Sequence, residues 1–195
     1  EGLPLSVETC PHYLVFDAER IPDGGTTFKC CPPIRSEANR DLLWAALADG
    51  TIDFVASDHS PATAALKLAG DGDFGVAWGG ISGLQLAFTA VFTEARRRGH
   101  TLDEVLGWMS TATAAFAGLD DRGSIRIGAR ADLVAFAPDR PFTVDAATLR
   151  HKNPVTAYDG AALTGVATAT WVGGALAQRD GILSDPVVGA LVARP

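Results

Sequence analysis

The chain has 195 residues, of which 47% are hydrophobic and 20% charged, a composition typical of a globular protein with one substantial core. The net charge of -7 and a pI near 5.0 disfavour a nucleic-acid partner, because phosphate binding requires a concentrated Lys/Arg surface. The one basic run, residues 96–98, is expected to end a helix, where cations complement the helix dipole. No run of about 18 apolar residues occurs, so we expect no membrane partner.

The three cysteines and the start of the chain bear on compartment and completeness. Three is an odd number, and none of the cysteines has the C-x-x-C spacing of a zinc or redox motif, so a reducing cytoplasm is the expected location. The chain begins at Glu1 in a strand-like segment, without an initiator methionine or a signal peptide. We therefore expect it to be a piece of a longer protein.

The first part of the chain alternates predicted strands with predicted helices. Strands are predicted over residues 5–9, 26–31 and 52–57, an alternation that indicates an α/β fold with parallel strands. A helix is predicted over residues 36–47, with Ser36 as its N-cap and Gly50 just past its end.

A Gly-rich loop over residues 70–83 follows the third predicted strand and opens into further predicted helices. These cover residues 84–98, about 102–109 with a cap at Thr101, and 110–117. From Gly123 the pattern changes to short strands.

The predicted strands of this last part cover residues 124–128 and 131–136, and then 168–172 and 176–178, which are joined by a Gly173-Gly174 hairpin turn. We therefore predict an α/β segment over residues 1–120 and a small β segment with a C-terminal tail over residues 121–195.

Two side chains suited to metal chemistry stand where predicted strands end. His12 follows the first strand and Asp58 follows the third, at the carboxyl ends where parallel α/β folds place their catalysts. Imidazole and carboxylate are ligands of a hydrolytic zinc site, and a carboxylate beside such a metal also acts as general base and then general acid. The residues alone leave an alternative open, because a histidine at a strand end is often simply packed and an aspartate often caps a loop.

The other candidates have weaker support. His59 is expected to point away from Asp58, since adjacent strand residues face opposite ways. The pair Cys30 and Cys31 precedes Pro-Pro and is expected to be buried as small hydrophobes, while His100 and His151 are expected at the surface without partners. The glycines 79–80 suit close approach of backbone to a ligand but match no phosphate-binding fingerprint.

Read together, these segments resemble the cyclic amidohydrolases, and among them most closely the allantoinases. Residues 8–14 (ETCPHYL) are similar to the family's E-x-C-P-H-Y strand end, and residues 28–35 (FKCCPPIR) to its K-x-x-P-P-[IL]-R. Residues 53–61 (DFVASDHSP) are similar to D-x-x-x-[ST]-D-H-x-P. The run WGGISGLQ at 78–85 and the stretch 123–134 extend the resemblance from about residue 7 to residue 181.

The resemblance implies the C-terminal part of a TIM-like (β/α)8 metal-dependent hydrolase barrel plus part of a small β-sandwich. In the family, two metal ions, expected to be zinc, are held by an H-x-H pair, a bridging carbamoylated lysine, two more histidines and an aspartate. Of these ligands His12 and Asp58 match. No H-x-H occurs, and the three lysines, Lys29, Lys67 and Lys152, do not lie at the bridging position.

The implied reaction is hydrolytic opening of a cyclic ureide, (S)-allantoin to allantoate, in purine and allantoin degradation. Asp58 is expected to be the catalytic acid/base, and Cys30, Ser57, Gly79 and Gly80 to contact the substrate. The resemblance also implies a homo-oligomer, often a tetramer in the family, and the missing N-terminal half of the barrel as the partner of this chain. The isolated chain is predicted to be inactive.

Two alternatives remain open. One is a hydantoinase, dihydropyrimidinase or dihydroorotase of the same fold, which a substrate panel would distinguish. The other is a non-catalytic homologue that keeps the fold as an assembly module, for which the absence of bound zinc in the full-length protein would speak. For the metal, the resemblance implies zinc, with iron, cobalt and manganese as alternatives.

Overall fold

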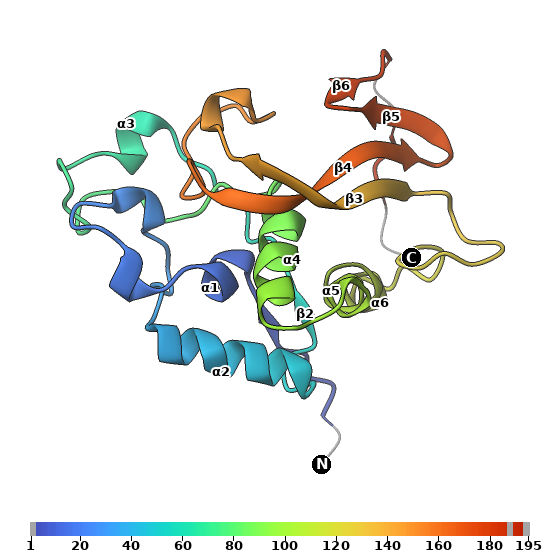
Figure 1. The fold of residues 1–195 in the computed structure, drawn as a ribbon, viewed down its shortest axis with the longest axis horizontal. Coiled ribbons are helices and arrows are strands. Elements are labelled where there is room, and N and C mark those ends of the chain that lie inside the picture. The colour runs from blue at the N-terminus through green and yellow to red at the C-terminus, as the bar shows by residue number, and fades with distance from the viewer. Residues whose placement is uncertain (1–2, 187–188, 193–195) are drawn as a thin grey trace.

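The first part of the fold is built on two short parallel strands. In the computed structural model, which describes residues 3–186 and 189–192, β1 (Glu8–Thr9) pairs with β2 (Phe54–Val55), with Glu8 opposite Phe54 (Figure 1). The connection between them contains α1 (Pro11–Val15), the 3-10 turns η1 (Ala18–Arg20) and η2 (Thr26–Phe28), and α2 (Glu37–Ala48). The parallel pairing of the first and third predicted strands is confirmed, although both strands are shorter than predicted.

The strand predicted over residues 26–31 is wrong. Its backbone turns on itself, since the Phe28 amide donates to the Gly25 carbonyl and the Lys29 amide to the Thr26 carbonyl, both at 3.0 Å. Its apolar pattern reflects burial of a loop rather than a pleated strand. Cys30 is buried as expected, whereas Cys31 is exposed.

The helices follow the predicted pattern with shifted ends. Ser36 caps α2 by accepting from the Asn39 amide, and Gly50 follows the helix with a φ of +79°, a backbone conformation that glycine adopts without strain. Helix α3 (Ala64–Lys67) was not predicted. Helix α4 (Ala87–Arg97) starts later than predicted, because the chain first turns at Gly83, whose carbonyl accepts from the Leu86 amide.

The next helical segment is continuous. It runs through α5 (Leu102–Leu106), the π-helical turn η3 (Gly107–Thr111) and α6 (Ala112–Phe116), in place of the two helices predicted. Thr101 and Glu104 form a reciprocal capping box at its start, which confirms the predicted cap.

A four-stranded antiparallel sheet forms the last part of the described chain. Its order is β3 (Leu133–Thr143), β4 (Ala162–Val172), β5 (Ala175–Arg179) and β6 (Ile182–Leu183), with the short turn η4 (Ala146–Thr148) between the first two strands. The hairpin at Gly173-Gly174 is confirmed.

Two sequence expectations for this β region need correction. Strand β3 continues through Pro138 and Pro141, and the register shifts there; proline is tolerated because β3 lies at the sheet edge and bulges at this point. The strand predicted over residues 124–128 is absent, and its apolar side chains Ile125 and Ile127 are almost fully exposed.

Helix α4 is the central element, lying between α1 and the sheet (Figure 1). One apolar cluster joins it to α1, α2 and α5, and a second joins it to the loops around Cys30 and Ile81 and to Tyr158 beyond β3. Tyr158 is 1% exposed and packs against Phe16, with ring centroids 4.7 Å apart. Residues on both sides of the boundary predicted near 120 thus share a core. The predicted ranges 1–120 and 121–195 also include residues 1–2, 187–188 and 193–195, which lie outside the described residues.

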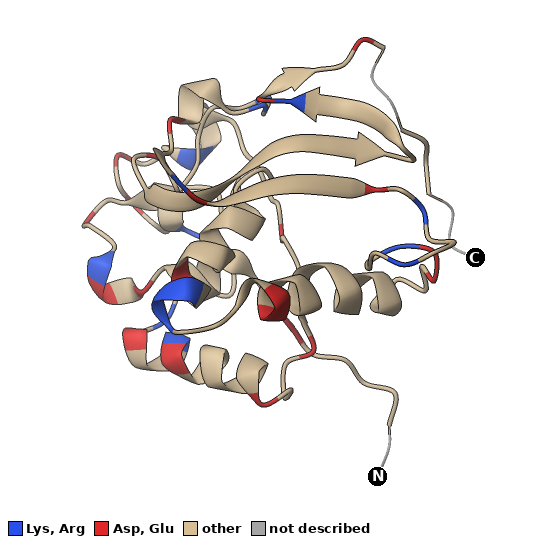
Figure 2. Cartoon of the chain, turned by 45° about the vertical axis from the view of Figure 1, so that its right-hand side comes forward, with Lys and Arg blue, Asp and Glu red and all other residues tan. Residues whose placement is uncertain are grey.

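Charged residues are interspersed, and Figure 2 shows Lys, Arg, Asp and Glu scattered over helices and loops with few on the long strands. The basic run 96–98 does end a helix, α4, as expected, and Arg98 pairs with Asp41 at 2.7 Å and with Glu94 at 2.8 Å. None of the helices in the described ranges has the length and apolar character needed to cross a membrane.

A buried ion pair holds α2 against the turn after α1, and its removal is expected to destabilise the fold. Arg40 and Asp17 are 4% and 2% exposed, and Arg40 Nη1 lies 2.6 Å from Asp17 Oδ2. Replacing Arg40 with Met leaves the buried Asp17 carboxylate with only the longer 3.5 Å ion pair to Arg20 and the Arg20 amide, and removing one partner of a buried pair costs about 3–5 kcal/mol. We expect a clear fall in the unfolding temperature of the complete gene product. Arg97→Met is the control, because that exposed arginine contributes about 0–1 kcal/mol; equal unfolding temperatures for the two variants would contradict the prediction.

Candidate metal and catalytic site

The structure brings His12 and Asp58 together. His12 lies in the first turn of α1, directly after β1, and Asp58 follows β2, so the parallel pairing of the two strands places both side chains at one edge. His12 Nε2 is 3.7 Å from Asp58 Oδ2. The sequence-based expectation that two strand ends meet at one site is therefore confirmed as geometry, while the roles of the two residues stay predictions.

The imidazole of His12 has an unsatisfied nitrogen. The residue is 1% exposed, and Nε2 has no hydrogen-bond partner within the described part of the chain. Burial lowers the pKa of His12 to about 4, and the Asp58 carboxylate opposes that shift only in part. His12 is therefore neutral at pH 7, and one of its two ring nitrogens is unprotonated and carries a lone pair. A buried polar atom without a partner is costly unless something binds it, and neutral imidazole is the form that ligates metals.

Cys10 is a third metal-competent side chain at this point. Its Sγ, a ring nitrogen of His12 and a carboxylate oxygen of Asp58 all lie within 4.8 Å of one another. Burial, followed by the nearby Asp58 carboxylate, raises the pKa of Cys10 to about 12, so the sulfur is a thiol at neutral pH. The His12 ring nitrogen, which has no hydrogen-bond partner among the described residues, and the Asp58 carboxylate are donors that fit a divalent cation.

Asp58 has an unusual backbone conformation. Its φ is +42°, in the left-handed region that few residues other than glycine, asparagine and aspartate adopt. The side chain is half-exposed, in contrast to the buried His12. The turn thus directs a solvent-accessible carboxylate toward a buried imidazole, an arrangement suited to moving a proton between a ligand and solvent.

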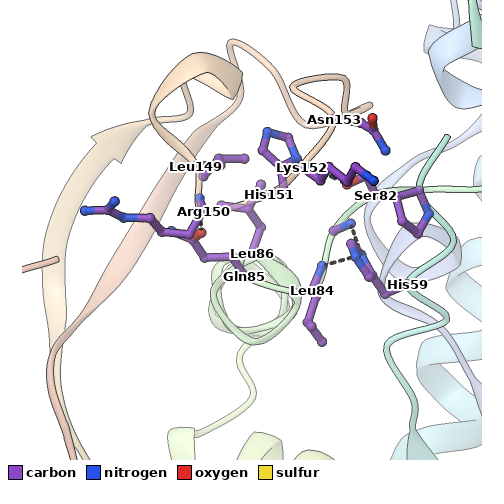
Figure 3. Close-up of a pocket in the computed structure, with 12 residues that line it drawn as sticks. His59, Ser82, Leu84, Gln85, Leu86, Leu149, Arg150, His151, Lys152 and Asn153 are labelled. Carbon is purple, nitrogen blue, oxygen red and sulfur yellow. Dashed lines mark hydrogen bonds between the residues drawn. The ribbon is translucent and has the colours of Figure 1, made fainter. Parts of the chain in front are cut away.

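His59 points elsewhere, as expected. Its Nδ1 accepts from the backbone amides of Gly83 and Leu84, both at 3.2 Å, and it lines a cavity of about 340 Å³ shown in Figure 3. His151 lines the same cavity, with Nε2 2.8 Å from the Ala146 carbonyl. The expectation of a partnerless surface His151 is wrong.

The second surface histidine of the prediction, His100, is also partnered. It stacks on Trp44 with ring centroids 5.5 Å apart and lies 3.1 Å from a Glu104 carboxylate oxygen. His100 therefore belongs to the packing around α2 and α5. Neither of these two contacts involves the metal-competent cluster of Cys10, His12 and Asp58.

The four predicted substrate contacts lie on three loops. Ser57 is half-buried beside Asp58; Cys30 is 7% exposed, and burial raises its pKa. Gly79 lies over Cys30, since a Cβ at Gly79 would be 4.0 Å from the Cys30 Cα. Gly80 has a φ of +128°, and a Cβ there would lie 2.5 Å from the Ser60 carbonyl oxygen, so only glycine fits. The structure thus gathers these positions near Asp58, and their contact with the substrate stays a prediction.

Sequence reasoning missed Lys67, which is 4% exposed and donates to the loops that carry Cys30 and Gly80. Lys67 lies in the Ala- and Leu-rich segment 64–69, where a single lysine gives no sequence signal that its own side chain is buried. It also missed Cys10 as a member of the cluster, although its spacing of two from His12 was a usable signal.

Comparison with known proteins decides the family. Residues 36–177 match the model of the amidohydrolase family. The chain belongs to the amidohydrolase family. Its relatives include the allantoinase of Streptomyces avermitilis, 57% identical over 186 residues, and that of Arabidopsis thaliana, 45% identical over 193 residues. The resemblance to allantoinases seen in the sequence is confirmed.

These amidohydrolase relatives are longer than the chain. The match covers 95% of this chain but 41% of the Streptomyces protein, and 98% against 38% for the Arabidopsis protein. Among solved structures, the D-hydantoinase (dihydropyrimidinase) of Thermus sp. aligns with a TM-score of 0.84 at 30% identity, covering 94% of this chain and 41% of that one. The L-hydantoinase of Arthrobacter aurescens gives 0.86 at 28%, covering 92% and 40%. The fold is thus that of part of a hydantoinase-like amidohydrolase.

Proposed function

We propose that this chain is the carboxy-terminal part of an allantoinase, an enzyme that hydrolyses (S)-allantoin to allantoate. The observation that carries the proposal is the 57% identity to an allantoinase over 95% of the chain, against 28–30% for the two hydantoinases described above. The geometry of His12 and Asp58 supports it, because these two residue types at adjoining strand ends suit metal-assisted hydrolysis.

His12 and Asp58 would hold a divalent cation, with zinc as the first expectation and two ions in the complete enzyme. When bound, such a cation polarises the ring carbonyl and lowers the pKa of a water. His12 contributes a neutral nitrogen, because burial keeps the imidazole unprotonated at pH 7. Asp58 would contribute a carboxylate oxygen, and the family resemblance implies a carbamoylated lysine as a further ligand, a role that none of the three lysines of this chain takes in the proposal.

Asp58 is the acid/base of the proposed reaction. Its half-exposed carboxylate accepts the proton of the attacking water and delivers it to the departing ring nitrogen, so one residue is base in the first step and acid in the second. The left-handed turn at Asp58 fixes the direction of the carboxylate while leaving it accessible to substrate.

Cys30, Ser57, Gly79 and Gly80 are the proposed contacts of the cyclic ureide. A small rigid ring rich in amide N–H and C=O groups is matched best by backbone donors and acceptors held in place. Two glycines side by side leave the backbone of the loop uncovered, with no side chain between it and a ring. The proposal therefore assigns recognition chiefly to the main chain of this loop.

The complete enzyme is proposed as a cytoplasmic homo-oligomer of purine and allantoin degradation, a tetramer by family precedent. Residues 1–120 complete a (β/α)8 barrel with an N-terminal half, and residues 121–195 supply part of the β-sandwich and a tail. Exposed apolar side chains support this, because Leu5, Ile125 and Ile127 are largely uncovered and Val7 is half-exposed among the described residues.

The test is a substrate panel on the purified complete gene product. Ring opening is measured for allantoin, hydantoin, dihydrouracil and dihydroorotate, with metal content determined in parallel. We expect kcat/KM for (S)-allantoin to exceed the others by about 100-fold or more, since discrimination by polar contacts reaches that range and beyond.

Two other outcomes would each select an alternative. Preference for hydantoin or dihydrouracil would replace the proposal with a hydantoinase, which the solved neighbours favour. A complete protein without bound metal and without activity on any of these rings would favour a non-catalytic assembly module.

A further inference from the structure

Two loops of the candidate site meet at one buried ammonium group. Lys67 ends α3 and is 4% exposed. Its Nζ donates to the backbone carbonyls of Lys29 at 2.7 Å, Trp78 at 3.2 Å and Gly80 at 2.6 Å. A lysine ammonium has three N–H donors and no acceptor, so all three donors are used on main-chain oxygens.

The carbonyls that Lys67 binds flank the proposed substrate contacts. Lys29 precedes Cys30, and Trp78 and Gly80 enclose Gly79. The two loops are also joined by the Gly80 amide, which donates to the Lys29 carbonyl at 2.9 Å. Lys67 therefore holds the backbone on both sides of Gly79 and on the N-terminal side of Cys30.

A second set of contacts joins the same loop to Asp58. Ser60 Oγ accepts from the Ile81 amide and donates to the Asp58 carbonyl, both at 3.0 Å, and the Ser60 amide donates to the Ile81 carbonyl at 3.0 Å. The distance between the acid/base and the Gly79–Gly80 backbone is thus fixed through a short chain of bonds.

We propose that Lys67 is a positioning residue that locks the Cys30 and Gly79–Gly80 loops into one substrate-binding surface at a set distance from Asp58. The inference rests on the proposed cyclic-amide hydrolysis. Lys67 touches neither substrate nor the metal-competent cluster; it acts through the carbonyls it binds. A lysine is suited to this because one compact group reaches three oxygens in different directions, where a planar guanidinium cannot.

Burial lowers the pKa of Lys67 to about 8, so the ammonium is still mainly protonated at pH 7. Partial negative charge on three carbonyl oxygens compensates the buried charge. The three hydrogen bonds from Lys67 Nζ are therefore formed under ordinary assay conditions.

The test compares Lys67→Met with the wild-type complete gene product. Methionine keeps the length and burial of the side chain but removes all three donors, while the Gly80–Lys29 bond and the Trp78 amide bond to Leu66 remain to hold the fold. We expect kcat/KM to fall by about 100-fold, the loss typical of a displacement near 1 Å, with metal content and unfolding temperature close to wild type. Leu68→Ala, an exposed neighbour at the same helix end, is the matched control and should keep its activity.

Hydrogen exchange separates positioning from general stability. In Lys67→Met, peptides covering residues 28–31 and 77–82 should exchange faster, and those of α2 and α4 should not. Unchanged kcat/KM, or exchange that rises equally throughout the chain, would overturn the proposal. If Lys67→Met does not fold, exchange in the wild type decides: residues 77–82 must be protected far beyond the exposed loop 70–75, and equal exchange would overturn it.

The two proposals fail differently. If the wild type opens no cyclic ureide, the proposed function is wrong, yet the exchange measurement still reports whether Lys67 holds the loops. If the wild type is active and Lys67→Met is equally active, the proposed function stands and the positioning role is wrong.

Discussion

Replacing Asp58 with Asn in the complete gene product is expected to lower kcat for ring opening by about 10³-fold, within the range that general acid–base groups contribute. The amide cannot accept the proton of the attacking water or deliver it to the ring nitrogen. Asparagine also tolerates the left-handed backbone at φ +42°, so this change removes the carboxylate chemistry without adding backbone strain, which alanine would add. Steady-state kinetics with (S)-allantoin measure the loss, and elemental analysis measures metal content.

The control is Asp139→Asn, which changes an exposed aspartate paired with Arg96 at the end of α4. That pair lies at the surface, so the variant should keep wild-type kinetics. Should Asp58→Asn retain more than about a tenth of the wild-type kcat, the acid/base role of Asp58 would be untenable. Loss of metal together with activity would instead make Asp58 chiefly a ligand, an outcome that the metal analysis identifies directly.

Local signals in the sequence predicted the helices well. The Ser36 cap, Gly50 and the Thr101–Glu104 capping box act within a few residues, and each appears in the structure as predicted. The strands were less predictable, because a strand exists only where a partner lies beside it. Residues 26–31 have strand-like composition but coil into η2, and residues 124–128 lie exposed without a neighbouring strand.

The candidate site was predictable where it depends on strand ends. His12 and Asp58 are 46 residues apart in sequence, and parallel pairing of their strands suffices to bring them together. The three hydrogen bonds of Lys67 were not predictable, because they depend on three carbonyl groups from two loops without regular structure. Carbonyl positions follow from backbone conformation rather than residue type, so no sequence pattern encodes them directly.

The chain expressed alone, as residues 1–195, is expected to be inactive and to self-associate. Its metal-competent cluster offers one imidazole, one carboxylate and one thiol among the described residues, whereas a zinc site that hydrolyses needs three protein ligands in place with an open position. Burial raises the pKa of Cys10 to about 12, so metal binding through this sulfur would have to release a proton, and only the His12 and Asp58 side chains can bind without that cost. Ring opening should be undetectable with added zinc, in the same assay that detects the complete protein.

Self-association follows from the apolar surface left open in the chain alone. Ile125 and Ile127 are exposed in the loop before β3, while Leu5 and Val7 lead into β1. Exposed apolar side chains of this kind favour contacts between copies, so size-exclusion chromatography with light scattering should give oligomers or aggregates. The double change Ile125→Ser and Ile127→Ser should reduce the association without restoring activity, because it removes the adhesive surface and leaves the ligand set unchanged. A monomeric chain with cooperative unfolding would contradict the expectation that another segment covers these residues in the complete protein. Zinc-dependent activity in that monomer would require a metal site complete within the chain.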